Sequence, residues 1–231
     1  MNGMSTIDTD LHDFLGKWRG RWPEWRIAQV FVAEAQRETA EAWFAMLQEW
    51  TDAAWAGDDA TPGFAKLGWW QEELIGWAKG ARRHPLGSVL QKRSAMWAPL
   101  ANELTALRSI REPIRAWAEP EAMLSQLHAL SSVIAACEHD LFAAQDQPVG
   151  DAFGLLAAHA LWRRDEVADD VQAKAWAHKL ATIAPRRAGP RPRRIHDALS
   201  LARLRRVAAD GEVSALSPPV ALWCSWRAAR G

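Results

Sequence analysis

Two carboxylates three residues apart, Glu49 and Asp52, are spaced so that they could bind a cation together. Positions i and i+3 lie on one face of an α-helix, so the two side chains could share a cation. Mg²⁺ prefers hard oxygen ligands of this kind. Paired carboxylates on a helix are also common as a plain solvated surface. The spacing therefore indicates either a weak cation site or an acidic surface.

Patterns for other kinds of catalysis are missing from the sequence. It holds no glycine-rich phosphate loop, no Gly-x-Ser-x-Gly nucleophile and no His-Glu-x-x-His metal motif. His84 precedes Pro85 at an expected helix start, where an imidazole can cap the helix or pack against it. Five further histidines lack metal-ligand spacing: His128, His139, His159, His178 and His196.

The element most clearly marked in the sequence is a helix over Pro62–Lys79. Its large apolar residues recur at helical spacing and form one stripe: Leu67, Trp70, Leu74 and Trp77. Thr61 is a suitable N-cap before a proline, and Gly80 is a suitable stop. Trp69 points about 100° away from Trp70, toward a second packing surface or a pocket. We therefore expect an interior helix with Trp70 buried.

The residues after this helix extend the motif, because Gly80 is soon followed by Arg82-Arg83-His84-Pro85. This order of Trp-Trp, two carboxylates, a glycine-ended helix and a His-Pro start resembles the squalene/phytoene synthase family. The resemblance implies an all-α isoprenoid synthase fold. It also implies two aspartate-rich segments on facing helices, through which Mg²⁺ ions bind a prenyl diphosphate.

The first aspartate-rich segment of that family should fall on residues 51–55, where only Asp52 is a carboxylate. Trp55 stands where the family has its last aspartate. Upstream, Arg37 takes the place of an arginine that contacts the diphosphate in the family. The resemblance therefore implies that the first metal site is lost, because chelation of Mg²⁺-diphosphate needs more than one charge.

The second segment is represented by Asp165 and Asp169, which follow an arginine with the family's Arg-Asp-x-x-x-Asp spacing. The glutamine and asparagine that precede this motif in the family are absent. An acidic run of this kind also fits a solvated helix face. The catalytic candidates are therefore Asp52, Asp165 and Asp169, and the metal candidates are these three together with Glu49.

The leading functional interpretation is a catalytically degenerate relative of these synthases. It would bind an isoprenoid-like or prenyl-phosphate ligand, or a protein partner, in a tryptophan-lined cavity, and it would need no cofactor. Guanidinium groups can hold an anionic headgroup without a metal. The expected ligand contacts are Arg37, Trp43, Trp69, Trp77, Arg82 and Arg83. One alternative is an active Mg²⁺-dependent prenyltransferase, and another is binding of nucleic acid or an acidic partner through the arginines of residues 186–206.

Composition narrows the class of protein further. Lysine plus arginine and aspartate plus glutamate balance at 28 each, which disfavours a globally basic nucleic-acid-binding protein. Fifteen tryptophans without a tyrosine suit a helical core, and a ligand tunnel or a membrane-facing surface is the alternative. Two cysteines, Cys137 and Cys224, fit a reducing compartment. Without an apolar leader or a membrane-spanning run, we expect a cytoplasmic protein, with peripheral membrane contact left open.

The chain reads throughout as helices separated by short proline or glycine segments. We expect one all-α, single-domain helical bundle over residues 1–231, with an N-terminal arm over 1–24 and an exposed Pro/Arg loop over 184–194. Trp and Arg alternate in residues 17–26, which should anchor the arm to the bundle or dock it at a membrane interface. The expected helices are Glu38–Ala56, Pro62–Lys79, Leu86–Ala95, Ala98–Arg108, Pro120–Ala144, Val149–Ile183, Arg194–Ala209 and Pro219–Ala229.

Overall fold

A computed structural model describes residues 6–145, 147–162, 171–185 and 189–230 of the chain. Every regular element in these residues is helical, which confirms the expected all-α class. In chain order the elements are α1 (Thr6–Arg21), α2 (Trp25–Ala28), η1 (Gln29–Phe31), α3 (Glu34–Trp55), α4 (Thr61–Ala78), η2 (Pro85–Ser88), α5 (Trp97–Glu103), α6 (Ala106–Ser109), α7 (Arg111–Arg115), α8 (Pro120–Gln126), α9 (His128–Leu141), α10 (Phe153–Trp162), α12 (Val171–Thr182), α13 (Arg191–Asp210) and α14 (Pro218–Ala229).

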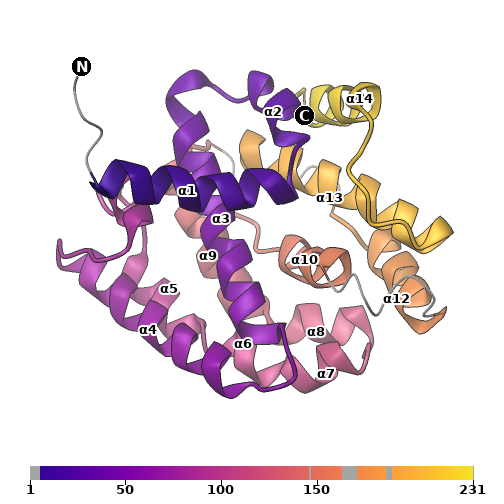
Figure 1. Ribbon diagram of the computed structural model, residues 1–231, viewed down its shortest axis with the longest axis horizontal. Helices are drawn as coiled ribbons and strands as arrows, with labels where there is room; N and C mark the ends of the chain where they lie inside the picture. The colour runs from indigo at the N-terminus through magenta and orange to yellow at the C-terminus, as the bar shows by residue number, and fades with distance from the viewer. Residues whose placement is uncertain (1–5, 146, 163–170, 186–188, 231) are drawn as a thin grey trace.

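Helix α3 runs through the middle of the molecule and organises the other helices (Figure 1). Helices α4 and α5 lie on one side of it, and α10, α12 and α13 lie on the other. Helix α1 packs across α3, while α14 packs on α13, α2 and η1. One buried apolar cluster extends from Leu11 in α1 to Ala221 in α14. Both halves of the chain therefore share one core.

The helix that carries the Trp-Trp motif matches its expected bounds within a residue at each end. Trp70 is 1% exposed, which confirms its predicted burial, while Trp69 is half-buried on a different face. The 3.6-residue period explains both observations, because adjacent positions on a helix point in different directions. The stripe of large apolar residues therefore faces the core as the sequence predicted.

Three tryptophan clusters fill much of the interior, and each surrounds one histidine. His84 lies 4.6 Å from Trp70 between ring centroids, His196 lies 4.4 Å from Phe44, and His159 lies 5.2 Å from Trp117. The tryptophans in contact with these histidines are Trp18, Trp22, Trp25, Trp55, Trp69, Trp70, Trp117 and Trp176. The tryptophan-rich composition is thus used largely for packing between helices.

The expected N-terminal arm over 1–24 is wrong, because α1 already begins at Thr6. Leu11, Leu15 and Trp18 recur at helical spacing and are buried against the core. Trp22 and Trp25 are buried as well, so the predicted anchoring of this Trp/Arg stretch to the bundle is confirmed.

The expected exposed loop over 184–194 is wrong from Arg191 onward, where α13 starts. Proline lacks an N–H group, but the first turn of a helix leaves its N–H groups without partners anyway. Pro192 therefore fits the first turn of α13, and both Pro190 and Pro192 are buried.

Three other expected helices are interrupted, and the one expected over 98–108 divides at residues 104–105 into α5 and α6. The helix expected over 120–144 divides at Leu127 into α8 and α9, and the segment expected over 86–95 holds only η2 and turns. A Cβ at Gly87 would lie 3.1 Å from Nε1 of Trp77 and 3.0 Å from Cβ of Arg82. The absence of a Cβ at Gly87 therefore allows this turn to pack closely against α4.

Candidate functional site

The carboxylate of Glu73 connects the Trp-Trp helix to the His-Pro turn. It accepts hydrogen bonds from the backbone N–H of Arg83 at 2.6 Å, the backbone N–H of His84 at 2.8 Å and Nε1 of Trp77 at 2.8 Å. Nε of Arg83 donates a further bond at 3.0 Å. Glu73 has almost no accessible surface, although it lies beside the exposed Arg83. Sequence reasoning counted Glu73 as part of the motif but did not give it this role.

Hydrogen bonding also decides the charge of Glu73. Burial tends to raise the pKa of this carboxyl, but the donated bonds of His84, Arg83 and Trp77 outweigh burial and lower it below its usual value. Glu73 is therefore an ionised carboxylate whose acceptor positions are used within the protein. The arrangement serves packing and leaves little capacity for a ligand.

His84 caps the short helix η2, as the sequence suggested. Its Nδ1 accepts a hydrogen bond from the backbone N–H of Leu86 at 3.1 Å. The ring packs on Trp70 and on Phe14, whose centroid is 4.9 Å away. Burial lowers the pKa of His84 to about 4, so the imidazole is neutral near pH 7.

The candidate metal ligands of α3 already have cationic partners. Glu49 forms an ion pair with Lys66, and Asp52 pairs with Arg21 at 2.5 Å. Gln48 also donates to Asp52 at 3.1 Å. Burial raises the pKa of Asp52 despite the opposing influence of Arg21. A Mg²⁺ ion would have to displace two cations here, so these residues as arranged do not fit a magnesium site.

Outside α3, the metal hypothesis gains no further ligands among the described residues. Within them, no three His, Cys, Asp or Glu side chains come together as a metal site would require. Trp55, in place of the family's last aspartate, is buried and donates its indole N–H to the carbonyl of Leu107 at 2.9 Å. Asp165 and Asp169 lie outside the described residues, so their role as candidates stays a prediction.

The expected aromatic ligand contacts lie in the packed interior. Trp43 is 0% exposed and donates its indole N–H to Glu138 at 2.6 Å. Trp77 is also buried and donates its indole N–H to Glu73. A side chain that lines a cavity wide enough for water keeps some accessible surface, and Trp43 keeps none. Trp69 is half-buried beneath the guanidinium of Arg83, which lies 5.2 Å from its ring. Binding of a ligand by Trp43 would therefore require the surrounding helices to move.

The expected basic contacts are separated in the structure. Nε of Arg37 donates to the carbonyls of Gln29 and Val32, which ties α3 to the end of η1. Arg82 and Arg83 are exposed beyond α4, where Arg83 pairs with Glu73. Arg37 is thus used to connect two elements, and whether the other two arginines bind a ligand stays a prediction.

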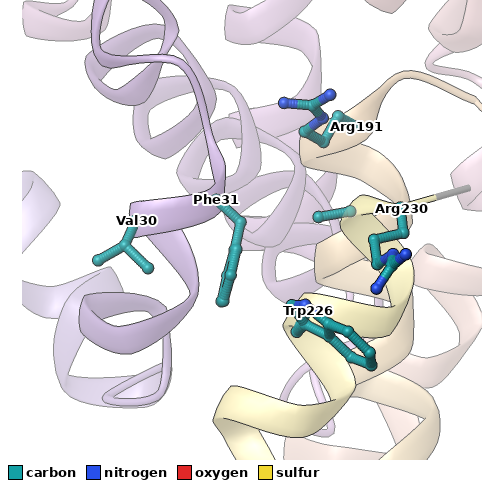
Figure 2. A pocket seen from close by; sticks show the side chains of 6 residues that line it. Val30, Phe31, Arg191, Trp226 and Arg230 are labelled. Atoms are coloured by element: carbon teal, nitrogen blue, oxygen red, sulfur yellow. The ribbon is translucent and has the colours of Figure 1, made fainter.

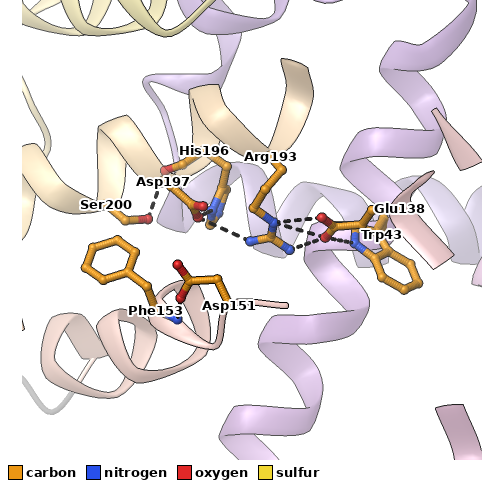
Figure 3. Close-up of polar contacts among 8 residues, drawn as sticks. All are labelled: Trp43, Glu138, Asp151, Phe153, Arg193, His196, Asp197 and Ser200. Atoms are coloured by element: carbon orange, nitrogen blue, oxygen red, sulfur yellow. Dashed lines mark hydrogen bonds and ion pairs between the residues drawn. The ribbon is translucent and has the colours of Figure 1, made fainter. Parts of the chain in front are cut away.

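A buried ionic network joins α3, α9 and α13 beside the start of α10 (Figure 3). Arg193 binds both carboxylate oxygens of Glu138, at 3.0 and 3.1 Å from Nε, and pairs with Asp197 at 3.3 Å. Its guanidinium also lies 4.9 Å from the ring of Phe44. A Cβ at Gly154 would lie 2.8 Å from Nη1 of Arg193, so glycine gives α10 its close approach. Sequence reasoning had placed Arg193 in an exposed loop.

Asp151 adds a third carboxyl near this network. It accepts the backbone N–H of Phe153 at 2.6 Å at the start of α10. Burial raises the pKa of Asp151, and the nearby carboxylates of Asp197 and Glu138 act in the same direction. Because the network is enclosed by helices, it is best explained as a polar part of the core.

Other arginines of the 186–206 segment are also used inside the protein. Arg203 forms a buried bidentate pair with Glu24, at 2.7 and 2.5 Å, and Glu24 accepts the backbone N–H of Leu216 at 2.6 Å. Arg194 donates to the carbonyls of Ala228 and Gly189. Such contacts leave fewer arginines for a nucleic acid or an acidic partner than the sequence alone suggested.

The C-terminal helix α14 presents its large residues to solvent. Leu222, Trp223 and Trp226 are 49%, 56% and 37% exposed, whereas the fully buried positions are the small residues Ala221 and Ser225. The rings of Trp223 and Trp226 stack with centroids 5.1 Å apart. Arg227 and Arg230 lie over these rings, at 6.0 and 4.8 Å. We call Leu222, Trp223, Trp226 and Arg227 the α14 outward face.

A hollow of about 480 Å³ adjoins this face, between η1, the start of α13 and the end of α14 (Figure 2). We call it the η1–α14 hollow. Its lining combines apolar side chains with two guanidinium groups: Val30, Phe31, Arg191, Trp226, Ala229 and Arg230. Sequence reasoning missed this site because its residues come from three distant segments.

Comparison with known proteins gives no assignment. No protein-family model matches the chain, and no match was found among curated proteins or among solved structures. Among the described residues, no helix combines the length and the apolar character needed to cross a membrane. A proposal for function therefore has to come from the geometry.

Proposed function

We propose that this chain is a non-catalytic helical protein that docks on anionic membrane surfaces through the α14 outward face. The observation that carries the proposal is the reversed amphipathicity of α14. A surface helix normally buries its large apolar residues and exposes polar ones. Helix α14 exposes Leu222 and two stacked tryptophans instead, while Ala221 and Ser225 face the protein.

The chemistry of this face suits a lipid–water interface. Tryptophan settles at the level of the headgroups, and an exposed leucine can enter the acyl boundary. Helix α14 contains no acidic residue, and Arg227 and Arg230 lie beside the tryptophans. Basic residues near a membrane surface contribute about 1 kcal/mol each when the lipids are anionic. Charge and apolar contact therefore favour the same partner.

The non-catalytic part of the proposal draws on α3. Glu49 and Asp52 are neutralised by Lys66 and Arg21, and Trp55 fills the position of a third carboxylate. These features support a degenerate relative of the squalene/phytoene synthases, which the Trp-Trp and His-Pro motif first suggested. The proposal differs from the sequence-based interpretation in one respect, since it moves binding from a central cavity to α14.

Co-sedimentation with lipid vesicles tests the proposal. The protein should pellet with vesicles of phosphatidylcholine and phosphatidylglycerol, and less with phosphatidylcholine alone. The double variant Trp223→Ser/Trp226→Ser should stay in the supernatant with a melting temperature close to that of the parent, because the two side chains are 56% and 37% exposed. A matched control is Met96→Ser/Val171→Ser, which removes two other exposed apolar side chains and should bind as the parent does.

Two results would contradict membrane docking. The first is a parent protein that remains in the supernatant with every lipid mixture. The second is a dimer in sedimentation analysis that the Trp223→Ser/Trp226→Ser variant converts to a monomer, because the α14 outward face would then be covered by a second copy.

A further inference from the structure

We infer that the η1–α14 hollow binds a phosphate monoester carried on a lipid chain. This inference rests on the proposed membrane docking, since it names the headgroup that the docked protein selects. The hollow and the α14 outward face share Trp226, so they form one continuous surface (Figure 2). A lipid could therefore reach the hollow from the bilayer on which α14 rests.

The two arginines of the hollow differ from the arginines of the buried ionic pairs. In the part of the chain that the structure describes, no carboxylate lies within ion-pair distance of Arg191 or Arg230. By contrast, Arg193 and Arg203 are each bound to a buried glutamate. A guanidinium group that has no internal acidic partner keeps its fork of donors for a phosphate, which it can bind bidentately.

Trp226 prepares one of these groups for binding. The guanidinium of Arg230 lies 4.8 Å from the centroid of the Trp226 ring. This cation–π contact holds the guanidinium group in place over the ring. The N–H groups of Arg230 remain at the edge of the hollow. Arg191 lies across the hollow at the beginning of α13. Arg191 and Arg230 thus belong to the lining of one hollow and give it a positive charge.

Charge matching selects a monoester over a diester. A phosphate monoester carries about −1.5 to −2 charges at pH 7, because its second pKa is about 6. Two guanidinium groups balance that charge, whereas a phosphodiester headgroup carries only one. Three oxygens of a monoester are also open to hydrogen bonds, which allows both arginines to bind it.

The lining of the hollow is mixed, and its apolar part favours a phosphate carried on a lipid over a free phosphate. Val30 is exposed, Phe31 is half-buried, and Ala229 is too small to fill the space between them and Arg230. A hollow of about 480 Å³ exceeds the size of a phosphate and can admit the first carbons of a chain. The shared chemistry is a phosphate monoester, and the wall indicates that it arrives on a hydrocarbon chain.

Vesicle binding at matched charge tests the selection. Vesicles of phosphatidylcholine should contain either phosphatidic acid or enough phosphatidylglycerol to give the same surface potential. The parent protein should bind the phosphatidic acid vesicles roughly tenfold more tightly, which corresponds to about 1.4 kcal/mol. The variant Arg191→Gln/Arg230→Gln should lose this preference and bind both kinds of vesicle equally. The control Arg227→Gln, on α14 but outside the hollow, should weaken both kinds equally and keep the preference.

A soluble assay separates the hollow from the membrane. Dioctanoyl phosphatidic acid below its micelle concentration should bind the parent protein in calorimetry, and inorganic phosphate should bind at least about tenfold more weakly. Binding should be lost in Arg191→Gln/Arg230→Gln. Equal affinity for inorganic phosphate would overturn the assignment of a lipid, and an unchanged preference in the double variant would overturn the assignment of the hollow. Binding of the soluble lipid without any vesicle binding would support the hollow and contradict the proposed membrane docking.

Discussion

The backbone N–H of His84 donates to the carboxylate of Glu73 at 2.8 Å, which joins the Trp-Trp helix to the His-Pro turn. Glu73 also binds the neighbouring Trp77 and Arg83, while the His84 ring packs on Trp70. The motif that first suggested a prenyl synthase is therefore one packed unit in this chain. Its tryptophan, glutamate and histidine side chains pack and form hydrogen bonds where α4 meets η2.

Replacing Glu73 with glutamine should destabilise the protein by about 2–4 kcal/mol, because an amide nitrogen would face N–H donors inside the protein. Urea unfolding of Glu73→Gln measures this loss. The neighbouring Glu72 is exposed and lies 3.7 Å from Arg83, so Glu72→Gln should change stability by less than about 0.5 kcal/mol. Equal losses in the two variants would show that the Glu73 bonds contribute little.

His84 should make the protein less stable as the pH falls from 6.5 toward 4. Its pKa is about 4 in the folded protein against 6.5 as the ordinary value, so the unfolded chain takes up the proton first. Above pH 6.5 the neutral His84 makes its full contribution to the free energy of unfolding. About 3 kcal/mol of this contribution is lost as the pH falls through the pKa of the folded protein. Burial lowers the pKa of His196 too, which acts in the same direction.

The variant His84→Asn isolates this contribution, because asparagine can cap η2 but does not titrate. The difference in unfolding free energy between parent and variant should shift steadily between pH 6.5 and 4. A difference that is constant across this range would contradict the assignment to His84.

Trp70→Ala should cost about 3–5 kcal/mol, as removal of a buried aromatic side chain does. Trp69→Ala should cost less, since Trp69 keeps part of its surface in water. Denaturant unfolding of both variants provides the comparison. A loss below about 1 kcal/mol for Trp70→Ala would contradict its place in the core.

Incubation with farnesyl or geranylgeranyl diphosphate and Mg²⁺ should release no pyrophosphate. The reason is that Glu49 and Asp52 are paired with Lys66 and Arg21 and carry little net charge for a metal. Product analysis by mass spectrometry gives the answer. Turnover that disappears in both Asp52→Asn and Asp165→Asn would restore the interpretation as an active prenyltransferase.

Local periodicity was sufficient to predict several elements. The stripe ending in Trp77 predicted α4, and Pro219–Ala229 differs from α14 by one residue. Helical spacing of Leu11, Leu15 and Trp18 could have revealed α1, but the first helix expected from the sequence begins only at Glu38, with an arm over 1–24. Pro192 suggested a loop because proline interrupts helices, although it is favourable in their first turn.

The polar core and the binding surface could not be predicted in this way. Glu138 and Arg193 are 55 residues apart, and no local pattern pairs a helical glutamate with one arginine among many. The α14 outward face could not be predicted either, since periodicity tells which residues of a helix share a face but not which face packs. The small residues Ala221 and Ser225 are buried instead, on a helix that packs on α13, α2 and η1, and this follows only from the tertiary structure.

Fluorescence quenching by brominated lipids measures the contact of α14 with a membrane most directly. Trp223 and Trp226 are exposed, while most other tryptophans of the described chain are buried. Vesicles of brominated phosphatidylcholine with an anionic lipid should quench part of the emission of the parent protein and leave Trp223→Ser/Trp226→Ser unquenched. An unquenched parent protein, or equal quenching of the double variant, would contradict docking through the α14 outward face.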